Sequence, residues 1–369
     1  MAKEVRWYGE VEPPHDGQAW EYKGRLRSVL EGDILKKTLS GWEGNEILAR
    51  DSTKIWKSLG FSGAPSCPGA FFSRVTPSSG CPASVNTLLE WGVHGGWVEA
   101  LRMKAVSGPL YHYDLKSAYH WASQYLYPEK THYYEGEPNR TEWVGAVILW
   151  ENRPDLPPWY RKAGKIVVIS SEDVDYYGLK FQHCYGVDWE ESTVDVGDAI
   201  CRWYDVVPPR TYKLITQSFW GRWIASGRCV RLIYRDGKVV KEIPMKTVGR
   251  AGRNLVWAYL TVSRVIQRVW SAVDVDTAAV FVDSIITRNP DVELGNELGD
   301  WKLEAVHEKG LWIDSAGVYT ALPVNNFDRS KWLRHSGHVA KAKPGALPFA
   351  KDMYSEGRRG GFLPDVGSA

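Results

Sequence analysis

The sequence predicts a fold that mixes helices and strands, of the α/β or α+β class, in two or three domains. The chain has 369 residues, and roughly 150 residues per domain give that number. Hydrophobic residues make up 44% of the chain and charged residues 24%, a balance that suits a packed globular protein and excludes global disorder. Helical and strand patterns follow one another in mixed order, which favours this class over an all-helical or all-strand fold.

The first half of the chain carries interleaved strand and helix signals. In chain order they predict a helix over 26–40, a proline-rich loop over 60–82, the end of a helix within 87–100, a strand over 110–114, a helix over 116–125, buried strands over 144–150 and 165–170, and a short helix over 171–179. The two buried strands are short uninterrupted apolar runs, and their length suits a strand better than a helix.

The second half continues the mixed pattern. In chain order it predicts a helix over 212–225, strands over 230–234 and 238–243, a long helix over 254–270, a pair of apolar strands within 278–287, and a basic tail beyond residue 324. Asp236-Gly237 joins the first two of these strands and is a strong hairpin signal.

Several classes of protein are excluded by composition. No apolar run approaches the ~20 residues that a membrane-spanning helix needs, so we expect no membrane association. The first residues lack the apolar core of a signal peptide, so we do not expect secretion. Five scattered cysteines fit a reducing compartment better than a disulfide framework. We therefore expect a cytoplasmic protein.

The net charge is only +2, but the basic residues are clustered. From residue 210 to 253 there are eleven basic residues and two acidic ones, and from 329 to 359 there are eight basic and two acidic. Both blocks contain interspersed aromatic residues, a composition that suits phosphate backbones and stacked bases. The alternative is an ordinary solvated face.

Three sets of polar residues carry candidate chemistry. Asp283 lies in the apolar run 280–286, where an ionised carboxylate is costly unless it is paired or binds a metal; the alternative is the tip of a hairpin. Asp114 follows a predicted strand, and its alternative role is a helix N-cap. Lys213, Gln217 and Gly221 share one helix face, which suits a phosphate and a flat ligand or is simply an exposed polar stripe.

Together these segments resemble family B DNA polymerases. The segment 114–119 (DLKSAY) resembles the first palm motif, Asp-x-x-Ser-Leu-Tyr. The segment 213–221 (KLITQSFWG) resembles the fingers motif, Lys-x-x-x-Asn-Ser-x-Tyr-Gly, and 282–284 (VDS) resembles the end of the third motif, Asp-Thr-Asp-Ser. The segment 93–97 (VHGGW) is similar to the Tyr-x-Gly-Gly template-binding motif of the protein-primed bacteriophage branch. The resemblance covers about residues 90–320 and keeps the motif order.

The resemblance implies an α+β right-hand fold. Its antiparallel palm sheet would be backed by helices, with short fingers and a small thumb. The implied divisions are 1–90, an N-terminal region of unknown role without a recognisable exonuclease; 91–190, the first part of the palm with the template-binding motif and motif A; 191–228, short fingers with motif B; 229–310, the second part of the palm with the hairpin and motif C; and 311–369, a thumb remnant and basic tail.

The resemblance also implies roles for individual residues. Catalysis and metal binding fall to Asp114 and Asp283, with the Leu115 carbonyl as a further metal ligand for two Mg²⁺ ions, or Mn²⁺ in their place. The implied nucleotide-binding residues are Lys213, Arg210, Gln217, Tyr119, Ser117, Leu115 and Gly221. The implied DNA-binding residues are Gly95, Gly96, His94, Arg264 and Tyr319. Tyr119 takes the position of a ring that rejects a 2′-hydroxyl, and its alternative role is a core tyrosine.

Some positions depart from the family pattern. Phe281 replaces the first aspartate of Asp-Thr-Asp, Gln217 replaces an asparagine and Trp220 a tyrosine. The lysine of a Lys-x-Tyr motif near the primer end is Gly317 here. No aspartate before Asp114 belongs to the Asp-x-Glu pattern that a two-metal exonuclease needs, so we expect no proofreading.

The expected function is template-directed DNA synthesis by two-metal nucleotidyl transfer to a primer 3′-hydroxyl. The alternatives are a primase or other palm nucleotidyltransferase, and a catalytically inactive nucleic-acid-binding remnant. Expected partners are template and primer DNA and dNTPs, with a terminal protein or other replication factors as further candidates. We expect a monomer in the cytoplasm, that of the bacterial host if the source is a virus.

Overall fold

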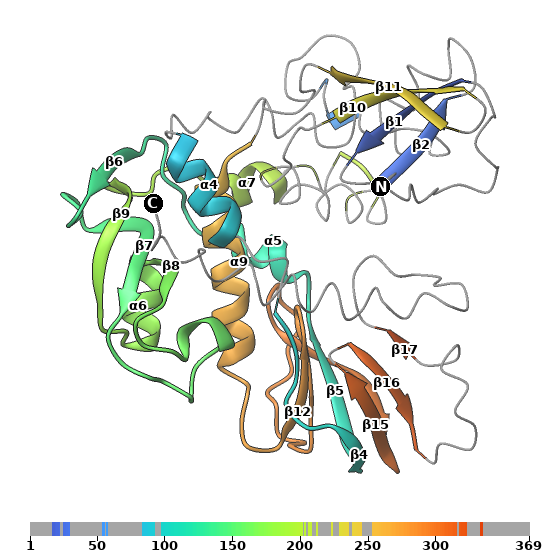
Figure 1. Ribbon diagram of the computed structural model, residues 1–369. Helices are drawn as coiled ribbons and strands as arrows, with labels where there is room; N and C mark the ends of the chain where they lie inside the picture. The colour runs from blue at the N-terminus through green and yellow to red at the C-terminus, as the bar shows by residue number, and fades with distance from the viewer. Residues whose placement is uncertain are drawn as a thin grey trace. The chain divides into compact units, whose positions relative to one another are not determined.

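The computed structural model describes residues 17–22, 25–29, 54, 55, 57, 83–92, 97–201, 203, 206–208, 212, 223, 229–235, 238–245, 253–315, 317–322, 333 and 334 (Figure 1). The chain divides into two compact units, one of Met1–Ser79 with Asp198–Asn254 and the other of Gly80–Gly197 with Leu255–Ala369. Both units are therefore built from segments that lie far apart in the sequence.

The first unit contains a four-stranded antiparallel sheet in the order β11-β10-β1-β2. Its strands are β1 (Gly17–Tyr22), β2 (Arg25–Val29), β10 (Cys229–Arg235) and β11 (Lys238–Met245). The predicted hairpin is confirmed, because β10 and β11 pair on either side of residues 236–237. The helix expected from residue 26 is wrong at its start, since 25–29 pairs as a strand with β1.

In the second unit, a five-stranded antiparallel sheet in the order β14-β5-β13-β12-β3 carries the two candidate aspartates. Its strands are β3 (Val98–Ala100), β5 (Leu110–Leu115), β12 (Thr277–Phe281), β13 (Ser284–Thr287) and β14 (Trp301–His307). The strands expected at 110–114 and within 278–287 are confirmed. The central strands β12 and β13 are buried at every position, as expected for apolar runs without alternation.

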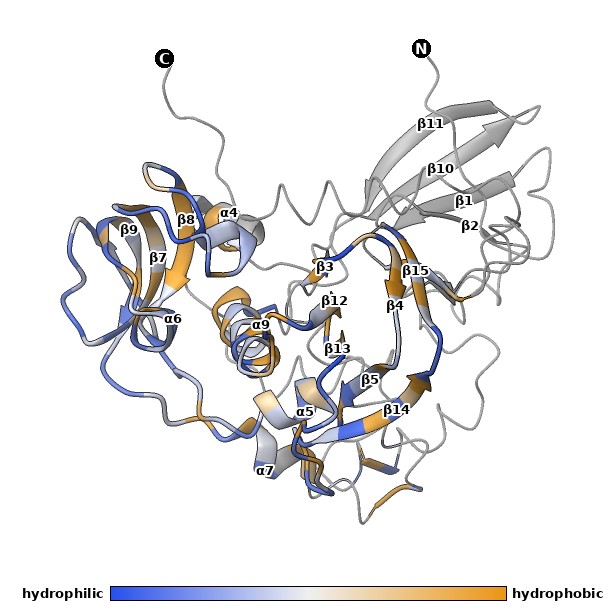
Figure 2. Ribbon diagram, turned by 90° about the horizontal axis from the view of Figure 1, so that it is seen from below, coloured by the Kyte–Doolittle hydropathy of each residue, from blue (hydrophilic) through white to orange (hydrophobic). Residues whose placement is uncertain are grey.

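A long helix, α9 (Leu255–Trp270), backs this sheet and confirms the helix expected over 254–270. Thirteen of its sixteen residues are buried, in keeping with a helix that is apolar on nearly every side. It packs against α4 (Ala83–Gly92), α5 (Ala118–Ala122) and α6 (Ser171–Tyr177). Figure 2 shows α9 between β12 and β13 on one side and the sheet that contains β7 and β8 on the other.

That second sheet of the unit has the antiparallel order β6-β9-β7-β8. Its strands are β6 (His132–Glu135), β7 (Glu142–Leu149), β8 (Ile166–Ser170) and β9 (Phe181–Trp189), with the 3-10 helix η2 (Pro158–Tyr160) between β7 and β8. The expected buried strands and the helix after them are confirmed. Residues 132–189 therefore pair among themselves and not with the five-stranded sheet that carries Asp114 and Asp283. The division implied by the resemblance had assigned all of 91–190 to one part of a palm.

A third sheet has the order β17-β16-β15-β4. It pairs β4 (Lys104–Ser107) with β15 (Gly310–Ser315), β16 (Val318–Ala321) and β17 (Leu333–Arg334). Its buried side chains share one core with the site-bearing sheet, through Val106, Leu311, Phe281 and Tyr319. One further short helix, α7, spans Val196–Cys201. None of the helices in the described ranges is long and apolar enough to cross a membrane.

Candidate active site

The pairing of β5 with β13 brings Asp114 and Asp283 together. Asp114 lies directly opposite Ser284, and Asp283 comes immediately before Ser284 at the tip of the β12–β13 hairpin. The backbone N–H of Leu115 donates a hydrogen bond to the carbonyl oxygen of Asp283 at 2.8 Å. Two carboxylates that are 169 positions apart in the sequence thus occupy one end of the sheet.

The hairpin tip has an unusual backbone. Val282 has a φ of 57°, in the left-handed region that a β-branched residue rarely adopts. Its N–H donates to the Trp97 carbonyl at 2.6 Å, which fixes the turn against the residue before β3. Ser284 Oγ donates to the Phe281 carbonyl at 3.1 Å. The hairpin that was the alternative role of Asp283 is present, and it places the aspartate close enough to Asp114 for the charge of that carboxylate to act on it.

Electrostatics at this pair disfavour two free negative charges. Burial, and secondly the charge of Asp114, raise the pKa of Asp283 to about 7. A divalent cation bound between the two groups would remove this repulsion, and carboxylates are the ligands that Mg²⁺ prefers. The donor set therefore fits a divalent ion. In the described part of the chain, no group of three or more His, Cys, Asp or Glu side chains is placed to hold a metal.

Two charged residues of β14, Lys302 and Glu304, lie next to Asp114 or next to each other. Lys302 lies opposite Asp114 in the strand register, with its Nζ 3.0 Å from Asp114 Oδ2. Lys302 also forms an ion pair with Glu304. The sequence did not predict either residue as part of the site, because the pairing of β14 with β5 cannot be read from periodicity.

The segment after Asp114 turns from strand into helix. Asp114 belongs to β5, so it does not cap the helix; the N-cap of α5 is Ser117, which has a φ of 48° and makes no side-chain capping bond. The helix is shorter than the predicted 116–125. Lys116 is anchored to the loop before β14, since its Nζ donates to the Gly295 carbonyl at 2.6 Å and to Asn296 Oδ1 at 2.9 Å.

Tyr119 lies on α5, close enough to the site for the charge of Asp283 to act on it. Burial, and secondly Asp283, raise the pKa of the Tyr119 hydroxyl above its ordinary value. The residue as a whole is half-buried. Its position agrees with a ring beside the carboxylate pair, and its burial also agrees with the alternative of a core tyrosine.

Tyr319 is placed differently from its expected contact with DNA. It is 1% exposed and packs against Phe281, with ring centroids 5.5 Å apart and nearly parallel planes. Burial raises the pKa of its hydroxyl to about 12. Phe281 therefore packs in the core shared with β16 and helps to bury Tyr319. In this arrangement Tyr319 has almost no surface to offer to DNA.

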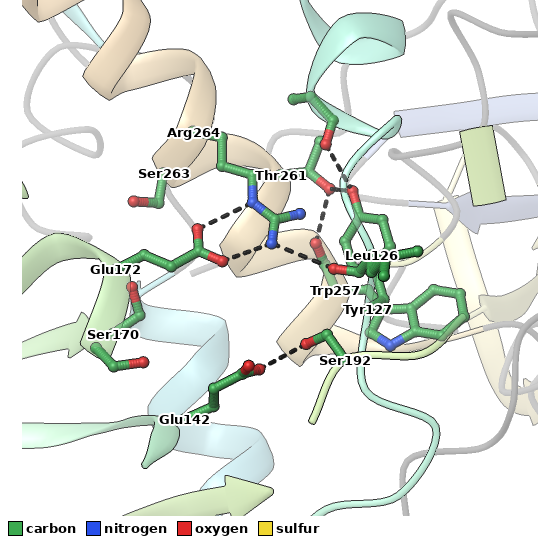
Figure 3. A network of polar contacts seen from close by, with 12 residues as sticks. Leu126, Tyr127, Glu142, Ser170, Glu172, Ser192, Trp257, Thr261, Ser263 and Arg264 are labelled. Atoms are coloured by element: carbon green, nitrogen blue, oxygen red, sulfur yellow. Dashed lines mark hydrogen bonds and ion pairs between the residues drawn. The ribbon is translucent and has the colours of Figure 1, made fainter. Parts of the chain in front are cut away.

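Arg264 also binds groups within the fold and is not exposed for contact with a primer phosphate. It is 6% exposed, and its guanidinium binds the Glu172 carboxylate through two hydrogen bonds of 2.5 and 2.9 Å (Figure 3). It donates to the Leu126 carbonyl at 3.3 Å and lies 5.0 Å from the ring centroids of Tyr125 and Tyr127. Arg264 forms this ion pair because α9 is buried on nearly every side and α6, which carries Glu172, packs against it.

The remaining predicted residues lie outside the part of the chain that the structure describes. They are His94, Gly95 and Gly96 of the template-binding segment, and Arg210, Lys213, Gln217 and Gly221 of the fingers segment. Their proposed roles stay predictions.

The fold described above is similar to that of DNA polymerases in solved structures. A protein that matches is phi29 DNA polymerase. Its post-translocation complex with primer-template DNA has a TM-score of 0.52 and 14% identity, covering 74% of this chain and 54% of that chain. Its ternary complex with primer-template DNA and incoming nucleotide has a TM-score of 0.52 and 14% identity, covering 83% and 60%. Its complex with single-stranded DNA has a TM-score of 0.51 and 15% identity, covering 74% and 54%.

At this level of identity the likeness concerns the fold alone. The chain spans between half and three fifths of the length of these polymerase chains. No protein-family model matches the sequence, and no curated protein sequence matches it.

Proposed function

We propose that this chain is a template-directed DNA polymerase that transfers dNMP from a dNTP to a primer 3′-hydroxyl. The observation that carries the proposal is the convergence of Asp114 and Asp283 at one end of an antiparallel sheet. The similarity of the fold to a DNA polymerase supports it, as does the order of the sequence motifs.

In this proposal Asp114, Asp283 and the Leu115 carbonyl hold divalent ions, Mg²⁺ or Mn²⁺. When bound, such ions stabilise negative charge on the attacking and leaving oxygens of the transfer. Asp114 lies in β5 and Asp283 lies in the turn directly before the neighbouring strand β13, so the sheet holds the two residues at one end. This explains why a fold would accept two carboxylates that repel each other in its ligand-free form.

The nucleotide would lie beside α5. Tyr119 and Ser117 come directly after the carboxylate-bearing strand, and we assign the Tyr119 ring to the face of the deoxyribose. Lys213 and Arg210 are proposed to meet the triphosphate charge, and Gln217 and Gly221 to lie along the base and sugar. The Gly95–Gly96 segment is proposed to hold the template strand.

Primer extension tests the proposal. Asp114→Asn and Asp283→Asn should each abolish Mg²⁺-dependent dNTP incorporation on a primed template, while binding of the primer-template stays close to that of the wild type. Asp175→Asn, an exposed change of the same kind on α6, is the matched control and should be fully active. Near-wild-type activity of Asp283→Asn would contradict the assignment of the site.

The same assay separates the alternatives. Synthesis on an unprimed template with NTPs would favour a primase, and DNA binding with no incorporation by the wild type would favour an inactive remnant. Phe281 occupies the position of the first aspartate in the Asp-Thr-Asp motif of family B polymerases. The missing carboxylate is the observation that supports an inactive remnant as an alternative.

We further propose that this chain does not proofread, because no Asp-x-Glu occurs in its first 113 residues. A 5′-labelled single strand should keep its length during incubation with Mg²⁺. Shortening from the 3′ end that persists in Asp114→Asn would contradict this.

A further inference from the structure

A lysine is paired with one member of the carboxylate pair. Lys302 on β14 and Asp114 on β5 are directly opposed in an antiparallel ladder, so their side chains project from the same face of the sheet. Lys302 Nζ lies 3.0 Å from Asp114 Oδ2, and the two side chains are 37% and 27% exposed. Because water reaches both groups, this ion pair can open without leaving a buried charge unpaired.

Glu304 offers Lys302 a second anionic partner on the same strand. The register between β14 and β5 shifts between Leu303 and Ala305, which makes Glu304 the extra residue of a β-bulge. Bulges re-aim side chains, and here the bulged glutamate forms an ion pair with Lys302. Lys302 therefore has carboxylates on two sides, one at the proposed metal site and one beyond it.

A divalent ion and an ammonium group would compete for Asp114. Carboxylate oxygens ligate Mg²⁺ at roughly 2.1 Å, so an ion on Asp114 would lie within a few ångströms of the present position of Lys302 Nζ. The repulsion between them is considerable at that range in a partly buried site. Lys302 would have to release Asp114, and Glu304 is the anion that can keep it nearby.

We propose that Lys302 is a positioning residue that exchanges Asp114 for Glu304 when divalent ions bind the Asp114–Asp283 pair. Without metal, its ammonium group holds the Asp114 carboxylate in place beside Asp283. With metal, it pairs with Glu304 alone, where it stays beside the site as a further positive charge. The inference rests on the proposed function in one respect, that Asp114 and Asp283 bind divalent metal.

The test is the affinity of the full-length protein for Mn²⁺ alone, measured from the electron paramagnetic resonance signal of free Mn²⁺ without DNA or nucleotide. Lys302→Met removes the competitor and should tighten Mn²⁺ binding about two- to fivefold, the range that a partly exposed ion pair supports. Glu304→Gln removes the alternative partner, leaves Lys302 on Asp114, and should weaken Mn²⁺ binding by a similar factor.

Two controls separate this exchange from a general effect of charge. Glu308→Gln makes the same change in net charge at an exposed position in the turn after β14 and should leave Mn²⁺ affinity unaltered. In the Lys302→Met background, Glu304→Gln should have no further effect, because Glu304 acts through Lys302.

A Glu304→Gln effect that persists in that background would overturn the exchange, as would weaker or unchanged Mn²⁺ binding by Lys302→Met. If Lys302→Met does not fold, the comparison of Glu304→Gln with Glu308→Gln decides the test, and equal affinities overturn the exchange.

Failure of the inference and failure of the proposed function give different results. If Asp114→Asn leaves Mn²⁺ binding unchanged, the metal site itself is refuted, and the exchange with it. If Asp114→Asn abolishes the site while Lys302→Met leaves the affinity of the wild type, only the exchange is refuted.

Discussion

Val282 and Asp283 form the two-residue turn between β12 and β13, and each departs from the ordinary behaviour of its residue type. Val282 adopts a left-handed backbone, and the pKa of Asp283 is raised to about 7 by burial and by Asp114. Strained backbone and perturbed carboxylates concentrate at functional sites. The turn therefore joins two independent signs of function in adjacent residues.

The raised pKa of Asp283 makes the stability of the metal-free protein depend on pH. A carboxyl whose pKa is about 7 when folded and 3.8 when unfolded binds its proton more tightly in the folded state. Its neutral form contributes stability that is complete below pH 3.8 and is lost as the pH rises towards 7. Asp283→Asn, which is neutral throughout, should thus be more stable than the wild type at pH 8, by up to about 4 kcal/mol.

Urea unfolding in EDTA measures this difference. The advantage of Asp283→Asn should shrink as the pH falls from 7 towards 4, while exposed Asp175→Asn should track the wild type at every pH. A stability difference that does not vary with pH would show that Asp283 carries its charge freely in the fold.

Tyr119 allows a test of sugar choice. If its ring lies against the deoxyribose, Tyr119→Val should raise the kcat/KM for NTPs relative to dNTPs, and each tenfold change in that ratio corresponds to ~1.4 kcal/mol in the transition state. Tyr119→Phe keeps the ring and should keep the ratio. A lower melting temperature of Tyr119→Val with an unchanged ratio would assign the ring to the core instead.

At the scale of elements, α9 is the part whose environment the sequence predicted least completely. The sequence predicted a long helix over 254–270, and the structure confirms it and shows that it is buried on nearly every side. The resemblance to polymerase motifs predicted a DNA contact for its arginine. Arg264 instead binds Glu172 on α6, a contact between residues 92 positions apart that depends on the packing of two elements and so leaves no local pattern.

The Arg264–Glu172 pair should matter for stability. Glu172→Gln leaves a guanidinium that is 6% exposed without its charged partner, and breaking such a buried pair costs about 3–5 kcal/mol, less here because Glu172 reaches solvent. We expect a loss of about 2 kcal/mol in urea unfolding. Asp155→Asn, which breaks the exposed pair with Arg153, should cost under about 1 kcal/mol. Equal costs for the two variants would contradict the structural role of Arg264.

The β6–β9 sheet depends on two glycines that face each other across β7 and β9. A Cβ on Gly186 would lie 2.6 Å from Gly145 Cα and 2.8 Å from the Tyr134 hydroxyl, with backbone nearby as well. Gly186→Ala should therefore destabilise the protein by at least about 2 kcal/mol, because backbone cannot move aside. Gly178→Ala has open space but a φ of 61°, so its cost should be nearer 1 kcal/mol. Thermal unfolding of the two variants compares steric overlap with backbone strain.

At the scale of the whole molecule, the sequence predicted the buried strands, the long helix and the carboxylate pair. These rest on local apolar runs and on short motifs, which a single chain displays directly. The sequence did not predict which strands pair with each other. It did not show that 229–245 pairs with 17–29, that 132–189 forms a separate sheet, or that the pairing of β14 with β5 brings Lys302 to Asp114. Strand pairing between distant segments is set by the global packing of the chain and has no local signature.

The two basic blocks lie largely outside the described residues, and their role is a prediction for the whole chain. If they follow nucleic acid, affinity for DNA should fall steeply with salt, because each neutralised phosphate releases counterions. Replacing Lys341, Lys343 and Lys351 with Gln should flatten the slope of log affinity against log salt by about two to three. An unchanged slope, measured by fluorescence anisotropy, would remove the tail from the DNA contact.

Each of the two units combines early and late segments of the chain, and this determines when its strands can pair during synthesis. Strands β1 and β2 leave the ribosome early, but their partner β10 begins at residue 229, and β5 likewise waits for β13 at residue 284. At ~5–20 residues per second, β1 pairs only with β2 and must wait for β10 for about 10–40 seconds of synthesis. Neither the sheet that contains β1 nor the sheet that contains β5 can be completed before most of the chain exists, so these early strands spend synthesis exposed to mispairing or to chaperones.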